Sequence, residues 1–111
     1  MYSPGQDTRR RETRYTLHLP VAIWLERQSE NRIKAESENI SLRGILVSTD
    51  SPIAVGAEVN VEVSLAAVTG QADAFLRSTG TVLRVTQPSP GAFKMAVGCD
   101  QPFQFPHEEL G

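Results

Sequence analysis

The sequence predicts an all-β protein built as a small six-stranded antiparallel barrel. The chain has 111 residues, which is the length of one domain. Apolar and polar residues alternate in short segments about ten residues apart, a pattern typical of strands rather than helices. Seven prolines and eight glycines punctuate these segments and argue against a helical bundle. We favour a barrel over a sandwich because closure removes the sheet edges that so small a domain cannot otherwise cover.

The first predicted strand covers residues 17–25. Apolar residues occupy every second position of this segment, namely Leu17, Leu19, Val21, Ile23 and Leu25. Pro20 lies on the opposite phase and has no N–H, so we expect it at a bulge or on an outward-facing edge. His18 and Trp24 share that phase, and we expect both at the surface rather than as metal ligands or a ligand platform. The preceding residues 1–8 are polar with Pro and Gly, and we expect them to be disordered.

Five more strands follow, separated by turn residues. They are predicted at residues 32–40, 45–48, 59–65, 74–86 and 93–97. A bulge at Gly80 would let the longest of them bend around the barrel. Residues 87–91 are predicted to be a hairpin connection, and Pro102 ends the last strand. We therefore divide the chain into a start at 1–8, a barrel with its arm at 9–101 and a tail at 102–111, in which residues 106–110 form at most a short C-terminal helical turn.

Composition excludes several classes of protein. The net charge of −2 argues against long nucleic acids, DNA or RNA, as the main partner. No apolar run approaches the roughly 20 residues of a membrane span, and the N-terminus has no apolar secretory core, so we expect a cytoplasmic protein without direct membrane insertion. The single Cys99 excludes an intrachain disulfide and a cysteine-cluster zinc site. We expect no metal and no cofactor.

The sequence shows no sign of an enzyme. It contains no phosphate-binding loop, no dinucleotide fingerprint and no paired catalytic carboxylates. Ser41 has no histidine partner in any motif, which argues against a serine nucleophile. His107 stands beside Glu108 and Glu109 at a spacing that does not suit a metal. We therefore expect no catalytic residue.

The charge is concentrated at one place. Residues 9–14 read Arg-Arg-Arg-Glu-Thr-Arg and hold four of the eleven basic residues of the chain. Such a run is either a solvated tail or a clamp for an anion, because guanidinium groups match phosphate oxygens in pairs. Composition alone leaves both interpretations open.

A second motif gives the arginine run its context. Arg10-x-x-x-Arg14 precedes the first strand, and Asn39-x-Ser41-x-x-Gly44 ends the second strand about 25 residues later. This pair, in this order and spacing, resembles the PilZ domain family over roughly residues 9–100. The segments Gly80-x-Val82-x-Arg84-Val85 and Ala96-Val97-Gly98 resemble the last two strands of that family. The resemblance implies a small six-stranded bacterial barrel that binds the second messenger cyclic di-GMP.

The resemblance also implies the binding residues, namely Arg9, Arg10, Arg14, Asn39, Ser41 and Gly44. The paired arginines can fork onto phosphate oxygens or guanine edges, or stack on a guanine face. Asn39 and Ser41 share one face, because Ile40 between them points to the core. A glycine at position 44 lets backbone approach the ligand. The family has Asp or Asn at the first position of the second motif, and the neutral Asn39 implies weaker pairing with guanine N–H groups.

Arg9 bears on stoichiometry. In the family, an arginine just before the arginine motif tends to accompany two intercalated nucleotide molecules, so we expect a bound dimer of cyclic di-GMP. Arg11 is expected to be a solvated side chain.

These residues predict a receptor or adaptor without catalysis, which orders its N-terminal arginine arm on binding cyclic di-GMP and signals to an unidentified downstream protein. The length leaves no room for an output domain, so we expect action in trans. One alternative is a barrel of the same family that binds only proteins. Another is an oligonucleotide-binding barrel, which the seven aromatic residues and the negative charge outside the arm disfavour.

Overall fold

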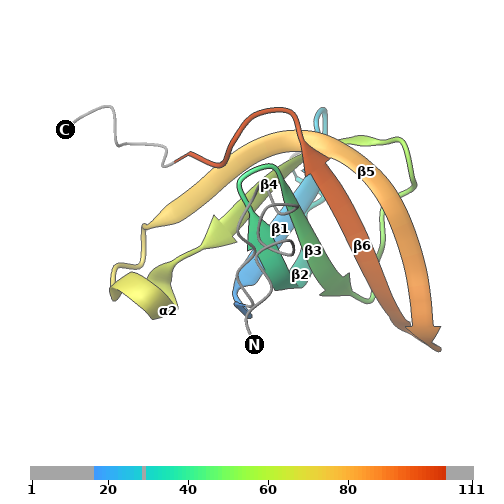
Figure 1. Cartoon of the computed structure of the whole chain (residues 1–111), viewed down its shortest axis with the longest axis horizontal. Helices are drawn as coiled ribbons and strands as arrows, with labels where there is room; N and C mark the ends of the chain where they lie inside the picture. The colour runs from blue at the N-terminus through green and yellow to red at the C-terminus, as the bar shows by residue number, and fades with distance from the viewer. Residues whose placement is uncertain (1–16, 29, 105–111) are drawn as a thin grey trace, which may run out of the picture.

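Six antiparallel strands close into a barrel in the computed structural model, which describes residues 17–28 and 30–104 (Figure 1). Around the barrel the strands follow the order β1-β2-β3-β6-β5-β4, and pairing of β1 with β4 closes it. The strands are β1 (Pro20–Leu25), β2 (Ile33–Ser41), β3 (Gly44–Thr49), β4 (Glu58–Ser64), β5 (Phe75–Ser89) and β6 (Ala92–Cys99). The predicted fold class is therefore confirmed.

Alternation along the strands fills the barrel interior with branched apolar side chains. The core consists of Leu19, Val21, Ile23, Ile40, Ile45, Val47, Val59, Val61, Val63, Val82, Met95 and Val97. Each such side chain contributes about 1.5–3 kcal/mol when fully buried. Leu17, which we predicted to start the first strand, is 41% exposed and lies outside β1. The strand begins at Pro20 because the chain before it is bonded to the Ser37 side chain rather than to a regular ladder.

The strand β5 is shared between two walls of the barrel. Its first half pairs with β4 and its second half with β6, and Figure 1 shows it arching across the molecule. The predicted bulge at Gly80 is wrong, because Gly80 pairs regularly with both Val59 and Cys99. The register instead shifts between Val82 and Arg84, which leaves Leu83 as the extra residue.

The end of β5 also differs from the prediction. The strand continues to Ser89, which pairs with Ala92, so the hairpin turn is shorter than the predicted connection at 87–91. A second irregularity between Thr86 and Ser89 accommodates Pro88, which has no N–H to give to a ladder.

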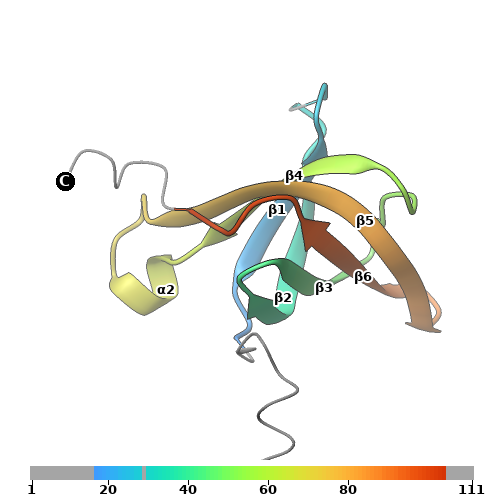
Figure 2. The same cartoon turned by 45° about the horizontal axis from the view of Figure 1, so that its top comes forward.

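A short helix that the sequence analysis did not predict follows β4. This helix, α2 (Ala66–Thr69), lies at one end of the molecule beside the start of β5 (Figures 1 and 2). Alanine favours the helix, and Gly70 ends it with a φ of 76° while donating its N–H to the Ala66 carbonyl. The helical turn predicted at 106–110 lies outside the described residues.

A bulge in β2 sets the phase of the second motif. Before it, Ile33 and Ala35 pack against the core and Ser37 is buried; after it, Ile40 is buried. The pairs Ser37↔Val47 and Asn39↔Leu46 leave Glu38 as the extra residue between them. This single added residue turns Asn39 and Ser41 to the outer surface while Ile40 faces inward.

Candidate functional site

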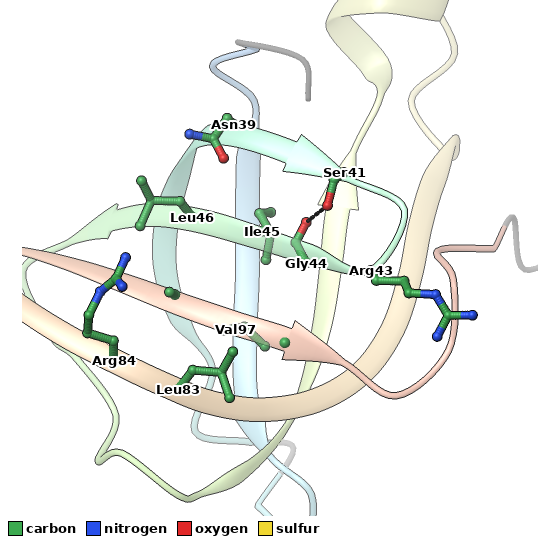
Figure 3. A pocket seen from close by; sticks show the side chains of 11 residues that line it. Asn39, Ser41, Arg43, Gly44, Ile45, Leu46, Leu83, Arg84 and Val97 are labelled. Atoms are coloured by element: carbon green, nitrogen blue, oxygen red, sulfur yellow. Dashed lines mark hydrogen bonds between the residues drawn. The ribbon is translucent and has the colours of Figure 1, made fainter. Parts of the chain in front are cut away.

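The outer face of β2, β3, β6 and β5 carries a cavity of about 300 Å³ (Figure 3). Two rows of side chains cross these four strands. The first row is Asn39, Leu46, Ala96 and Arg84, and the second is Ser41, Gly44, Gly98 and Thr81. In Figure 3, Asn39 and Ser41 lie on one side, Leu83 and Arg84 on the other, and β3 and β6 run between them.

Small residues form the floor of this cavity. Gly44, Ala96 and Gly98 occupy its centre, where larger side chains would fill it. A Cβ added at Gly44 would lie 3.2 Å from the Val97 carbonyl oxygen, and one added at Gly98 would lie 2.7 Å from the Leu83 Cδ1. The floor is therefore backbone and methyl groups, a surface that a flat ring can approach closely.

The second sequence motif supplies one rim of the cavity. Asn39, Ser41 and Gly44 all line it, and Asn39 and Ser41 lie on the same face, as predicted. The Ser41 hydroxyl donates a hydrogen bond of 3.4 Å to the Gly44 carbonyl, across the turn made by Leu42 and Arg43. The Asn39 amide makes no hydrogen bond within the described part of the chain, so its donor and acceptor groups are available.

The opposite rim contains two residues that the site prediction did not include. Leu83 and Arg84 follow one another at the β5 bulge and both line the cavity. The Arg84 guanidinium makes no hydrogen bond or ion pair with any residue in the ranges 17–28 and 30–104. In a regular strand Arg84 would share the inward face of Val82, two residues earlier, and the bulge at Leu83 turns it outward. Only the pairing of Arg84 with Ala96 places it opposite Asn39.

The Glu38 carboxylate lies next to Asn39 at the rim of the cavity, and Lys94 offsets its charge. Glu38 accepts a hydrogen bond from the Ser48 hydroxyl, and its other oxygen lies 3.8 Å from the Lys94 ammonium. The Ser48 hydrogen bond, helped by the positive charge of Lys94, lowers the pKa of Glu38 below its ordinary value. Glu38 is thus ionised at neutral pH, and Lys94 offsets the charge it places near the cavity.

Cys99 follows the cavity floor in β6. Burial raises the pKa of its thiol above the ordinary value, so the thiol is protonated at neutral pH. Cys99 is thus an unreactive residue at the end of β6.

The predicted arginines Arg9, Arg10 and Arg14 lie outside the described residues. The chain enters the described part at Leu17, whose carbonyl accepts a hydrogen bond from the Ser37 hydroxyl. Arg14 is three residues before Leu17, a distance of at most about 11 Å of extended chain. The structure thus brings Asn39, Ser41 and Gly44 together and fixes the point from which the arginine run departs.

A second hollow of about 330 Å³ lies on the wall formed by β1, β4 and the start of β5. Trp24 faces outward there, and the Arg32 guanidinium stacks 3.8 Å from the centre of its ring. The buried Glu62 accepts a hydrogen bond of 2.7 Å from Arg77 and one of 3.4 Å from Arg32. Because a carboxylate already engages both guanidinium groups, this hollow is a weaker candidate for an anion than the first cavity.

Two further properties concern only the described ranges. Among those residues, no three His, Cys, Asp or Glu side chains are grouped to hold a metal ion. No helix in the same ranges is long and apolar enough to cross a bilayer.

Comparisons with known proteins agree with the motifs. The model of the PilZ domain family matches residues 8–107. Among solved structures, the chain is similar to the Bacillus subtilis inhibitor of motility MotI/DgrA, with a TM-score of 0.65 and 22% sequence identity. That alignment covers 84% of this chain and 43% of the other, so this chain spans less than half the length of its structural neighbour. A comparison with curated proteins found no match.

Proposed function

This chain belongs to the PilZ domain family, and on that premise we propose that it is a receptor for cyclic di-GMP that signals to a partner protein. The observation that carries the proposal is the meeting of Asn39, Ser41 and Gly44 at one cavity with a floor of small residues. PilZ domains are regulatory receptor and adaptor modules, and we propose that this chain has no catalytic activity of its own.

The cavity suits a ligand with flat rings and anionic groups. A guanine can lie on the floor of Gly44 and Ala96, beside the Leu83 side chain that packs over Gly98. Asn39 and Ser41 offer an amide and a hydroxyl to base edges or phosphate oxygens. Arg84 offers a guanidinium from the other rim, which matches either a phosphate or the O6/N7 edge of a guanine.

The arginine arm completes the proposed site. Two phosphates attract Arg10 and Arg14 to the barrel surface beside the second motif, and the ordered arm becomes a new surface for a partner. Arg9, by its place just before the motif, favours a bound dimer of cyclic di-GMP.

Calorimetric titration with cyclic di-GMP tests the proposal. We expect the intact chain to bind, and Arg14→Ala to weaken binding at least tenfold, because hydrogen bonds from charged groups contribute about 1.5–3 kcal/mol. Arg27→Ala is a matched control, since Arg27 is exposed in the turn after β1 and does not line the cavity. Unchanged affinity of Arg14→Ala would show that the site is wrongly assigned.

A second candidate function is protein interaction without a nucleotide. The structural likeness to an inhibitor of motility keeps it in consideration. Titration separates the two, because a chain that binds only proteins gives no heat and no rise in melting temperature with cyclic di-GMP. Affinity capture with and without the nucleotide then tests for the partner, and motility components are the first candidates.

A further inference from the structure

The chain just before β1 is attached to β2 through one buried side chain. Pro20 has no N–H, and the regular pairing of β1 with β2 ends at the pair Pro20↔Glu36. Beyond it, the Ser37 N–H donates to the Leu19 carbonyl at 2.9 Å, and the Leu19 N–H donates to the Ser37 hydroxyl at 2.9 Å. The same hydroxyl donates to the Leu17 carbonyl. Ser37 is fully buried, with 0% exposure.

The hydroxyl of Ser37 takes the place of a strand carbonyl. The Ser37 carbonyl is itself engaged, at 3.1 Å, by the Nδ1 atom of His18. One residue therefore contacts three successive residues, Leu17, His18 and Leu19, through its N–H, its carbonyl and its hydroxyl. An alanine at this position would keep the backbone contacts but leave the Leu19 N–H and the Leu17 carbonyl without this partner.

Ser37 also borders the bulge that orients the proposed site. Glu38 is the extra residue, and Asn39 follows it at the rim of the cavity. The two halves of the proposed site thus meet at Ser37. On one side lies Asn39, and on the other lies Leu17, from which the arginine run departs.

We propose that Ser37 is a positioning residue. It holds Leu17, where the arginine-bearing segment joins the barrel, close to Asn39 at the rim of the cavity, so that Arg14 reaches a ligand there. The inference rests on the proposed function. Ser37 need not touch the ligand. It acts by limiting where the chain at Leu17 can lie, which raises the effective concentration of the arginines at the cavity.

A double-mutant cycle with cyclic di-GMP titration tests this role. We expect Ser37→Ala to weaken binding about tenfold in the intact chain but less than twofold in the Arg14→Ala background, because Ser37 acts through that arginine. Thr49→Val is the matched control, since the Thr49 side chain also donates a hydrogen bond from a buried site, to the Lys34 carbonyl, away from the cavity. It should lower the melting temperature as Ser37→Ala does, yet leave the affinity unchanged.

A second variant protects the test against poor folding of Ser37→Ala. His18 is exposed, so His18→Ala removes its contact to the Ser37 carbonyl without emptying a buried site and should weaken binding about threefold. Equal losses from Ser37→Ala with and without Arg14, or wild-type affinity in both Ser37→Ala and His18→Ala, would overturn the inference. Absence of binding by the wild-type chain would instead overturn the proposed function on which it rests.

Discussion

Two glycines on the neighbouring strands β5 and β6, Gly80 and Gly98, have different roles. A Cβ at Gly80 would lie 2.3 Å from the Gly98 carbonyl oxygen, which belongs to the backbone and cannot move without shifting a strand. A Cβ at Gly98 would instead meet the end of the exposed Leu83 side chain, which can rotate away. Gly80 is thus required for strand packing, whereas Gly98 makes room for the Leu83 side chain beside the cavity.

This contrast predicts opposite phenotypes for the same substitution. We expect Gly80→Ala to destabilise the fold by about 3 kcal/mol or more, which lowers the melting temperature by at least about 10 °C. Gly98→Ala should leave the melting temperature within about 3 °C of wild type but weaken cyclic di-GMP binding about tenfold, because its methyl group displaces the Leu83 side chain that lines the cavity. Thermal melts and calorimetry on the two variants check both statements. A large loss of stability in Gly98→Ala would refute the distinction.

At the scale of elements, the strands were predictable from alternation, but their irregularities were harder to place. Ile33 and Ala35 occupy odd positions and Ile40 an even one, so the change of phase signalled a bulge in β2 that the sequence analysis did not draw out. In β5 the core contacts change phase in the same way, from Val82 to Val85, but Leu83 shares the phase of Val85, so the sequence alone does not place the bulge. The register of β5 against β6 decides which β5 side chains join the cavity.

The other features that differ between prediction and structure have a similar cause. The helix α2 is four residues long, too short for an amphipathic pattern, and depends on Gly70 at its end. A bulge was predicted at Gly80 because glycine in a strand often marks one, whereas here Gly80 permits the close approach of two strands. By contrast, the outward face of Asn39 and Ser41 could be predicted, because both alternate with the buried Ile40 and all three lie after the bulge.

The Glu62 side chain joins elements on the wall opposite the cavity. It extends from β4, pairs with Arg77 in β5, and pairs with Arg32, the residue just before β2. We expect Glu62→Gln to lower stability by about 1–2 kcal/mol. This is less than for a fully buried pair, because the two arginine side chains are 45% and 56% exposed.

Thermal melts at low and high salt measure this effect, with Glu58→Gln in the same strand as the matched control because Glu58 is exposed. The control should melt like wild type. Identical melting of Glu62→Gln and Glu58→Gln would mean that the pairs contribute no net stability. Binding of cyclic di-GMP should be unaffected in both variants, since neither residue lines the cavity.

At the scale of the whole molecule, stability and proposed binding reside in different parts of the chain. The core cluster begins at Leu19, whereas the predicted arginines precede residue 15. We therefore expect removal of residues 1–15 to change the melting temperature of the ligand-free protein by less than about 3 °C and to abolish cyclic di-GMP binding. A nucleotide concentration 100 times the Kd should stabilise the full chain by about 2.7 kcal/mol, or roughly 10 °C, and the shortened chain not at all.

Differential scanning calorimetry of the two chains, with and without nucleotide, checks this separation. The net charge of −2 is an average over a basic segment and an acidic remainder. A shortened chain that still gained stability from the nucleotide would place binding in the barrel alone.

The outer edge of β5 has a further consequence for solubility. On the edge turned away from β6, its last hydrogen bonds to a neighbouring segment are at Val82, whose carbonyl accepts from the Gly56 N–H and whose N–H donates to the Ala57 carbonyl. Beyond Val82, no strand of the described residues pairs with this edge, while β6 continues to pair with the other edge. An unpaired edge is a template on which other copies of a chain can aggregate. The bulge at Leu83 twists this edge and Pro88 removes one of its donors. The irregularities that shape the binding face thus also discourage edge-to-edge aggregation at high concentration.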